Sequence, residues 1–145
     1  MILLYFVVPF SIVDYSAPRL ILSVDFTDAN NLLAGVMNLK GFKVSKSKSI
    51  DDCLSIITQT EDKIDVVLMD KLSAVENEFY LVNQIKKMTP DTMVVIIADN
   101  ADEDEKLLDK NIDHLVVRPI TPENLADKVL YLLATRELKR FKEAA

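Results

Sequence analysis

Short, continuous apolar runs alternate along the chain with segments in which apolar residues recur every three or four positions. The runs predict β-strands, and the spaced segments predict amphipathic helices. Two runs, 65–70 (DVVLMD) and 93–98 (MVVIIA), are apolar through their centre, which is typical of parallel strands covered on both faces. The five predicted strands are residues 20–24, 42–45, 65–70, 93–98 and 115–118.

Residues that suit helix ends mark the segments between these strands. Ser49, followed three residues later by Asp52, resembles a capping box, and Gly41 suits the end of the preceding helix. Thr121 with Pro122 after it predicts the start of the last helix. We expect helices from Thr27 or Asp28 to Gly41, after Ser49, over 76–88, over 102–111, and from Thr121 to as far as residue 144.

Five strands alternating with five helices, without an internal repeat or a linker, predict one doubly wound α/β domain over residues 19–145. Its sheet is expected to be parallel. In the first helix, the side chains expected on the apolar side are Leu32, Leu33, Val36, Met37 and Leu39. In the third helix, over 76–88, the side chains expected to point inward are Phe79, Val82 and Ile85.

An apolar extension, residues 1–18, precedes this domain. Residues 1–13 are almost wholly apolar and include Pro9. The run is shorter than the roughly 20 apolar residues that span a bilayer, and it lacks the positive residues of a secretory signal, so we expect no membrane span. Three interpretations stay open: an arm or strand that docks on the domain or on a partner chain, a weakly membrane-associating segment, or an artefact of the chosen start site.

Charge and cysteine content narrow the function classes. The net charge of −6 argues against nucleic acid as the main partner, because a nucleic-acid surface needs clustered Lys and Arg. The single cysteine, Cys53, can form neither an internal disulfide nor a metal cluster, and we expect a buried structural thiol. Without a disulfide framework, a cytoplasmic location is the default expectation.

Three polar residues fall at the carboxyl ends of predicted strands, where doubly wound folds form their crevice. They are Asp25, Asp70 and Arg118. If the first and third strands are neighbours, the two carboxylates converge and repel unless a cation relieves them. Mg²⁺ suits such a site, and Arg118 can also supply the positive charge. The alternative is that these side chains only cap helices or form plain ion pairs.

Four segments resemble the receiver domain of response regulators: "RLILSVDFTDANNLLAGVMNLKGFKV", "DKIDVVLMD", "TPDTMVVIIAD" and "HLVVRPITPENLADKVLYLL". The resemblance implies a flavodoxin-like sheet with strand order 2-1-3-4-5. It implies that Asp70 is at the phosphoacceptor position and that Asp25 matches one of the acidic pair that holds Mg²⁺. Arg118 takes the place of the lysine that contacts the phosphoryl group, and Pro119 follows it, as in the family, where this peptide bond is commonly cis.

The chain departs from the family pattern around these residues. Asp25 stands alone, because its neighbours are not acidic. In the loop after Asp70, Ala74 and Glu78 stand where the family has Pro and Gly. Arg118 keeps the charge of a lysine, but its planar fork differs from a compact ammonium.

Two further departures concern the response to phosphorylation. Ala98 replaces the Ser or Thr whose hydroxyl follows the phosphoryl group, and Leu115 replaces the aromatic residue that changes rotamer. Both the hydroxyl that would contact the phosphoryl group and the ring that would change rotamer are therefore absent. A switch needs two discrete states that the ligand biases. The sequence favours a stand-alone, degenerate receiver that acts through protein–protein interaction. The alternative is a working Mg²⁺-dependent phosphoacceptor that a histidine kinase phosphorylates on Asp70.

The expected partners are a histidine kinase or a downstream signalling protein, which would meet the face made by the fourth helix, the fifth strand and the last helix. A homodimer through the last helix or the apolar arm is a further hypothesis. Tyr131, Leu138 and Phe141 of that helix are candidates for such contacts, or they cover the domain's own core or the arm.

Enzyme classes fit the sequence less well. A flavin or nucleotide enzyme would need a glycine-rich loop after the first strand, but "DFTDAN" contains no glycine. A cobalamin-binding module would need a histidine near that strand, whereas the only one, His114, precedes the fifth strand and is expected at the surface or in a cap. A metalloenzyme would need ligands beyond carboxylates. We therefore expect no enzymatic activity.

Overall fold

A computed structural model describes residues 17–23, 28–75, 78–100 and 105–144. The described strands are β1 (Arg19–Ser23), β2 (Lys43–Lys46), β3 (Val66–Asp70), β4 (Met93–Ala98) and β5 (His114–Val117). They form one sheet in the order β2-β1-β3-β4-β5, and every neighbouring pair is parallel. The predicted parallel α/β fold and its strand order 2-1-3-4-5 are confirmed.

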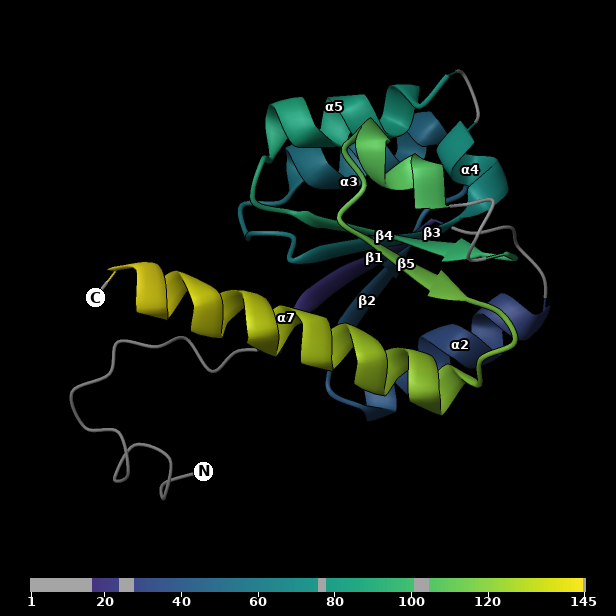
Figure 1. Cartoon of the computed structure of the whole chain (residues 1–145). Coiled ribbons are helices and arrows are strands. Elements are labelled where there is room, and N and C mark those ends of the chain that lie inside the picture. The colour runs from purple at the N-terminus through teal and green to yellow at the C-terminus, as the bar shows by residue number, and fades with distance from the viewer. Residues whose placement is uncertain (1–16, 24–27, 76–77, 101–104, 145) are drawn as a thin grey trace.

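Helices cover both faces of this sheet (Figure 1). They are α2 (Asp28–Leu39), α3 (Ile50–Gln59), α4 (Lys71–Val75), α5 (Tyr80–Met88), the 3-10 helix η1 (Glu105–Lys110) and α7 (Pro122–Ala144). Helices α2 and α7 lie on one face, and α3, α4 and α5 lie on the other. The short acidic helix expected over 102–111 is therefore a 3-10 helix over its described part.

Successive side chains of the central strands point to opposite faces, so each strand serves two cores. In β3, Val66 and Leu68 pack with residues of α2 and α7, whereas Val67 and Met69 pack with residues of α3 and α5. All six residues of β4 are buried. This double coverage is the reason that the two central strands have no polar residue before their ends.

The helix ends follow the predicted capping chemistry. The Ser49 hydroxyl accepts a hydrogen bond from the backbone nitrogen of Asp52 at 3.0 Å, and the Asp52 carboxylate accepts one from the backbone of Lys48 at 2.8 Å. Gly41 has a φ of +107°, a conformation that favours glycine after a helix. The Thr121 hydroxyl accepts from the backbone nitrogen of Asn124 at 3.1 Å and caps α7.

The predicted buried face of the first helix is wrong in part. Leu33 and Met37 are buried as expected, but Leu32 is 62% exposed and Leu39 is 88% exposed. Ala34, three residues before Met37, completes the buried stripe instead. The helix meets the sheet through one stripe, and two leucines seven residues apart share the stripe that faces away from it.

The third helix begins earlier than predicted and is divided in two. Helix α4 starts directly after β3, and α5 starts at Tyr80. Glu78 and Phe79 between them have positive φ values of 54° and 66°, which a continuous helix does not allow. Val82 and Ile85 are buried as predicted, whereas Phe79 is only partly buried.

Cys53 is fully buried, as the sequence predicted. Burial raises the pKa of its thiol to about 11, so the group stays protonated at neutral pH. In the part of the chain that the structure describes, no helix is long and apolar enough to cross a membrane.

Candidate functional site

The carboxyl ends of β3, β4 and β5 bring three of the predicted site positions to one edge of the sheet. In the strand register, Asp70 is opposite Ile97, and Ala98 is opposite Val117. Arg118 follows directly, and its backbone nitrogen donates to the carbonyl of Ala98 at 2.8 Å. The Arg118–Pro119 peptide bond is cis, as the family resemblance implied.

Asp70 caps the helix that follows it. Its Oδ1 atom accepts a hydrogen bond from the backbone nitrogen of Ser73 at 2.7 Å, and the side chain is partly buried. A carboxylate in this position satisfies a backbone donor that the first turn of a helix leaves unpaired. Asp70, which the resemblance places at the phosphoacceptor position, therefore has a local structural function as well as a nucleophilic group.

Arg118 points its charge at Asp99, a residue that the sequence analysis did not select. The Arg118 Nη1 atom lies 3.1 Å from Asp99 Oδ1, and the two side chains are 48% and 68% exposed. Asp99 follows β4 directly, so the rule that selected Asp70 and Arg118 also applies to it. Exposed ion pairs of this kind contribute about 0–1 kcal/mol, and another anion can therefore displace the contact.

Ala98 and Leu115, which the resemblance places at the positions that respond to phosphorylation, have apolar surroundings. Ala98 is fully buried at the end of β4. Leu115 lies in β5 and packs against the core cluster that includes Met69 and Ile96. A buried methyl group offers no hydrogen bond to an anion, and an aliphatic side chain packed on a core has no ring to reorient.

A divalent cation would depend on Asp70 and Asp25, but Asp25 lies outside the described residues. Mg²⁺ is held by one or two carboxylates together with several waters, and Asp70 is an oxygen ligand of that kind. Among the described residues, no group of three or more His, Cys, Asp or Glu side chains gathers around a common point. Asp70 therefore fits the donor chemistry of Mg²⁺ as a single described ligand.

The comparisons with known proteins agree with this geometry. No protein-family model matches the chain, and no curated protein matches it in sequence. Solved structures do match. A response regulator receiver domain protein from Clostridium thermocellum is 23% identical with a TM-score of 0.67, and the match covers 83% of this chain and 98% of that one.

Two further structures extend the comparison. A CheY-like receiver domain protein from Methanospirillum hungatei is 18% identical with a TM-score of 0.70, over 86% of this chain and 99% of that one. NtrX from Brucella abortus is 22% identical with a TM-score of 0.73, over 88% of this chain but only 29% of that longer one. The chain has the fold of response-regulator receiver domains.

Proposed function

We propose that this chain is a degenerate receiver in a phosphorelay signalling pathway, and that it acts by binding other proteins largely independently of phosphorylation at Asp70. The observation that carries this proposal is the fully buried methyl group of Ala98 at the edge that Asp70 and Arg118 share. A receiver that responds to phosphorylation needs a polar group there to follow the phosphoryl oxygens. Receiver domains are signalling domains rather than classical enzymes, and we propose no catalytic turnover for this chain.

The hydrogen bond made by Asp70 bears on which of its two carboxylate oxygens could be phosphorylated. For phosphorylation, a carboxylate oxygen of Asp70 would attack the phosphorus of a phosphohistidine, and the imidazole would leave as the acyl phosphate forms. Oδ1 already accepts from the Ser73 backbone at 2.7 Å, so modification of this oxygen would weaken the cap of α4, whereas attack through Oδ2 would leave the cap in place. Mg²⁺, when bound, would neutralise phosphoryl oxygens, and Asp70 and Asp25 would be its ligands.

A working phosphoacceptor is the second candidate. Asp70 and Arg118 lie at the same edge of the sheet, and Arg118 is half-exposed in a weak contact with Asp99. The guanidinium is therefore able to turn from Asp99 to a phosphoryl group. This arrangement would hold a phosphoryl group on Asp70, but the side chains of Ala98 and Leu115 would not transmit its presence.

The proposed binding surface for a kinase or a downstream protein is the face made by η1, β5 and the first half of α7. Its partners are proteins rather than nucleic acid, in keeping with the net charge of −6. We propose a cytoplasmic location, and we propose that residues 1–18 form an extension outside the receiver-like domain of residues 19–145.

The test is a pair of amide NMR spectra recorded with Mg²⁺, before and after addition of BeF₃⁻ or acetyl phosphate. We expect no shifts, or shifts confined to the residues around Asp70 and lost in Asp70→Asn. Asp70-dependent shifts that reach Leu115 and η1 in the unmodified chain would overturn the proposal. The matched variant is Ala98→Ser, which adds one hydroxyl, and we expect its spectrum to show a wider response than the unmodified chain.

A further inference from the structure

Helix α7 is longer than the face of the sheet that it covers. Its first half packs on the sheet through buried side chains, which are Leu125, Ala126, Val129, Leu132 and Leu133. Its second half extends past the edge of the sheet, away from the other helices (Figure 1). The 23-residue helix therefore presents several turns that the domain's own core does not need.

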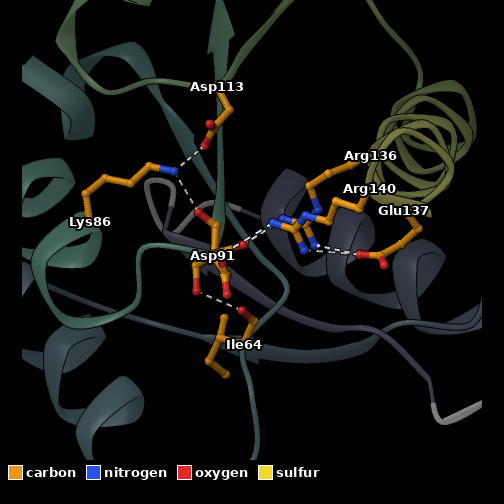
Figure 2. Close-up of polar contacts among 8 residues, drawn as sticks. Ile64, Lys86, Asp91, Asp113, Arg136, Glu137 and Arg140 are labelled. Carbon is orange, nitrogen blue, oxygen red and sulfur yellow. Dashed lines mark hydrogen bonds and ion pairs between the residues drawn. The ribbon is translucent and has the colours of Figure 1, made fainter. Parts of the chain in front are cut away.

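The extended half is held in place by its own polar contacts. Arg136 Nη1 donates to the backbone carbonyl of Asp91 at 2.7 Å, and Arg140 lies 3.5 Å from the carboxylate of the same residue (Figure 2). Arg136 is only 17% exposed. These contacts join the helix to the loop that enters β4, so the helix continues in a defined direction beyond the sheet.

A stripe of apolar residues runs along the opposite side of α7, from the end of its first half through its extended half. Tyr131 is 62% exposed, Leu138 is 55% exposed and Phe141 is 74% exposed, and Ala134 lies between them. The spacing of 131, 134, 138 and 141 is three, four and three residues, which is the a and d pattern of a coiled-coil heptad. At 100° per residue the stripe lies on the far side of the helix from Val129 and Leu132, so the sheet does not cover it.

Charged residues flank the stripe, and their positions determine whether two such helices would pair in a parallel or an antiparallel orientation. With Tyr131 and Leu138 at a positions, Glu137 is at g and Lys142 is at e. In a parallel, in-register pair, g of one helix lies beside the e residue five positions later on the other, so each Glu137 meets a Lys142. In an antiparallel pair, like positions face each other, and Glu137 would meet Glu137. The charges therefore favour the parallel arrangement.

The contacts that Glu137 makes within its own chain do not prevent this exchange. Its carboxylate lies 3.4 Å from Arg140 Nη1 and 3.6 Å from Arg136 Nη2, and Glu137 is 63% exposed. Exposed ion pairs at such distances are weak, and the carboxylate has room for a second partner.

We propose that the stripe of Tyr131, Ala134, Leu138 and Phe141 is a homodimer interface, at which the α7 helices of two copies form a short parallel coiled coil. Isolated helices of this length are marginal because nucleation is unfavourable. Here the first half of α7 is already folded on the sheet, so that step is complete before the two copies meet. The interface does not involve Asp70 and is independent of its phosphorylation.

The first test measures the oligomeric state of the full chain by sedimentation equilibrium. We expect a reversible dimer, and we expect Leu138→Glu to weaken association at least tenfold, because two carboxylates would face each other in the seam. Leu32→Glu is the matched control, since Leu32 is 62% exposed, close to the 55% of Leu138, but lies on α2. A monomer at concentrations up to about 1 mM would overturn the proposal, as would a dimer that survives Leu138→Glu.

The second test separates the two orientations. Tyr131→Cys and Phe141→Cys, made singly, should each form a disulfide between two copies under mild oxidation, because like a or d positions meet in a parallel pair. Lys139→Cys, on another side of the helix, is the control, and the buried native Cys53 should stay reduced. An antiparallel pair would separate at least one of the two introduced cysteines from its copy and would contradict the parallel assignment.

The third test concerns the flanking charges. Glu137→Lys and Lys142→Glu should each weaken the dimer, and the double variant should restore it, because the attraction is re-formed with reversed signs. If instead the apolar residues 1–13 or a lipid surface cover the stripe, the chain will remain monomeric in solution and the double variant will restore nothing. Either of these results would overturn the proposal.

Discussion

At the edge of the sheet where the strands begin, the carboxylate of Asp113 bridges a helix and two strands, whereas at the opposite edge the side chains of Arg118 and Asp99 are half-exposed. At the beginning edge, Lys86 of α5 donates to Asp113 at 2.6 Å (Figure 2). The same carboxylate accepts from the backbone of Val94 at 2.7 Å. At the other edge, Arg118 and Asp99 form one exposed pair.

The Asp113 carboxylate and the Arg118–Asp99 pair therefore differ in how far the folded state depends on them. A carboxylate that bridges a helix and two strands is committed to the folded state, and its partners are lost if it moves. A half-exposed pair contributes little to stability and can rearrange around a ligand. This difference is in keeping with our proposal that a ligand or phosphoryl group would be held at the edge with Asp70, Arg118 and Asp99.

The largest expected effect is that of Asp113→Ala. The substitution removes two hydrogen bonds to a charged acceptor and leaves Lys86, which is 20% exposed, without its partner carboxylate. We expect a loss of about 2–3 kcal/mol in the free energy of unfolding, measured by urea denaturation. Asp99→Ala is the counterpart at the other edge and should lose less than about 1 kcal/mol. Equal losses of stability in Asp113→Ala and Asp99→Ala would show that the two edges do not differ in their contribution to the folded state.

Thr92→Val should have the next largest effect. The Thr92 hydroxyl is buried at the beginning of β4 and donates to the carbonyl of Ile64 at 2.8 Å. The variant keeps the shape but leaves that carbonyl unpaired, so we expect a loss of about 1–2 kcal/mol by the same measurement. The control is Thr135→Val, whose hydroxyl is exposed on α7 and donates within the helix at 2.8 Å. A neutral Thr92→Val would show that the buried hydroxyl is not needed.

Asp70→Ala measures how much the Asp70 side chain contributes to the free energy of unfolding. The cap on Ser73 is lost, and helix caps of this type contribute about 1 kcal/mol. Asp70→Asn keeps an oxygen that can accept the same hydrogen bond, so it should unfold close to the unmodified chain. If both variants are equally destabilised, the charge rather than the cap is responsible.

His114→Gln gives the smallest effect, which appears in the pH dependence of stability. Burial lowers the pKa of His114 below its ordinary value of 6.5. As pH falls below 6.5, the unfolded chain takes up a proton before the folded chain does, so the unmodified protein loses stability until pH passes the folded pKa. The variant should lack this loss as pH falls below 6.5 in urea denaturation. Parallel curves for the two proteins would contradict the shift.

The sequence alone predicts much of the arrangement at the two edges of the sheet. The continuous apolar runs of β3 and β4 identify the two central strands, and the polar residues that end them are Asp70 and, after Ala98, Asp99. The start of α7 follows from Thr121 and Pro122, whose chemistry is local. Features that depend on neighbouring residues in the chain, such as caps and strand centres, were predicted well.

Features that depend on packing were predicted less well. Leu39 is apolar and correctly spaced, yet it is 88% exposed, because the stripe of α2 that meets the sheet passes through Leu33 and Met37. The division between α4 and α5 depends on left-handed backbone at Glu78 and Phe79, for which neither residue type is a signal. A helix pattern shows which residues share a side, but not which side faces the sheet.

The site divides in the same way. The sequence by itself determined that Asp70, Ala98 and Arg118 end three parallel strands, and parallel strands present their ends at one edge. The sequence left open whether Asp70 caps a helix, which it does through Ser73, and only the tertiary structure decided that Arg118 turns to Asp99, 19 residues earlier in the chain. Position along a strand follows from the local pattern, whereas the partner of a charged side chain depends on which donors and acceptors the folded chain brings within about 3 Å.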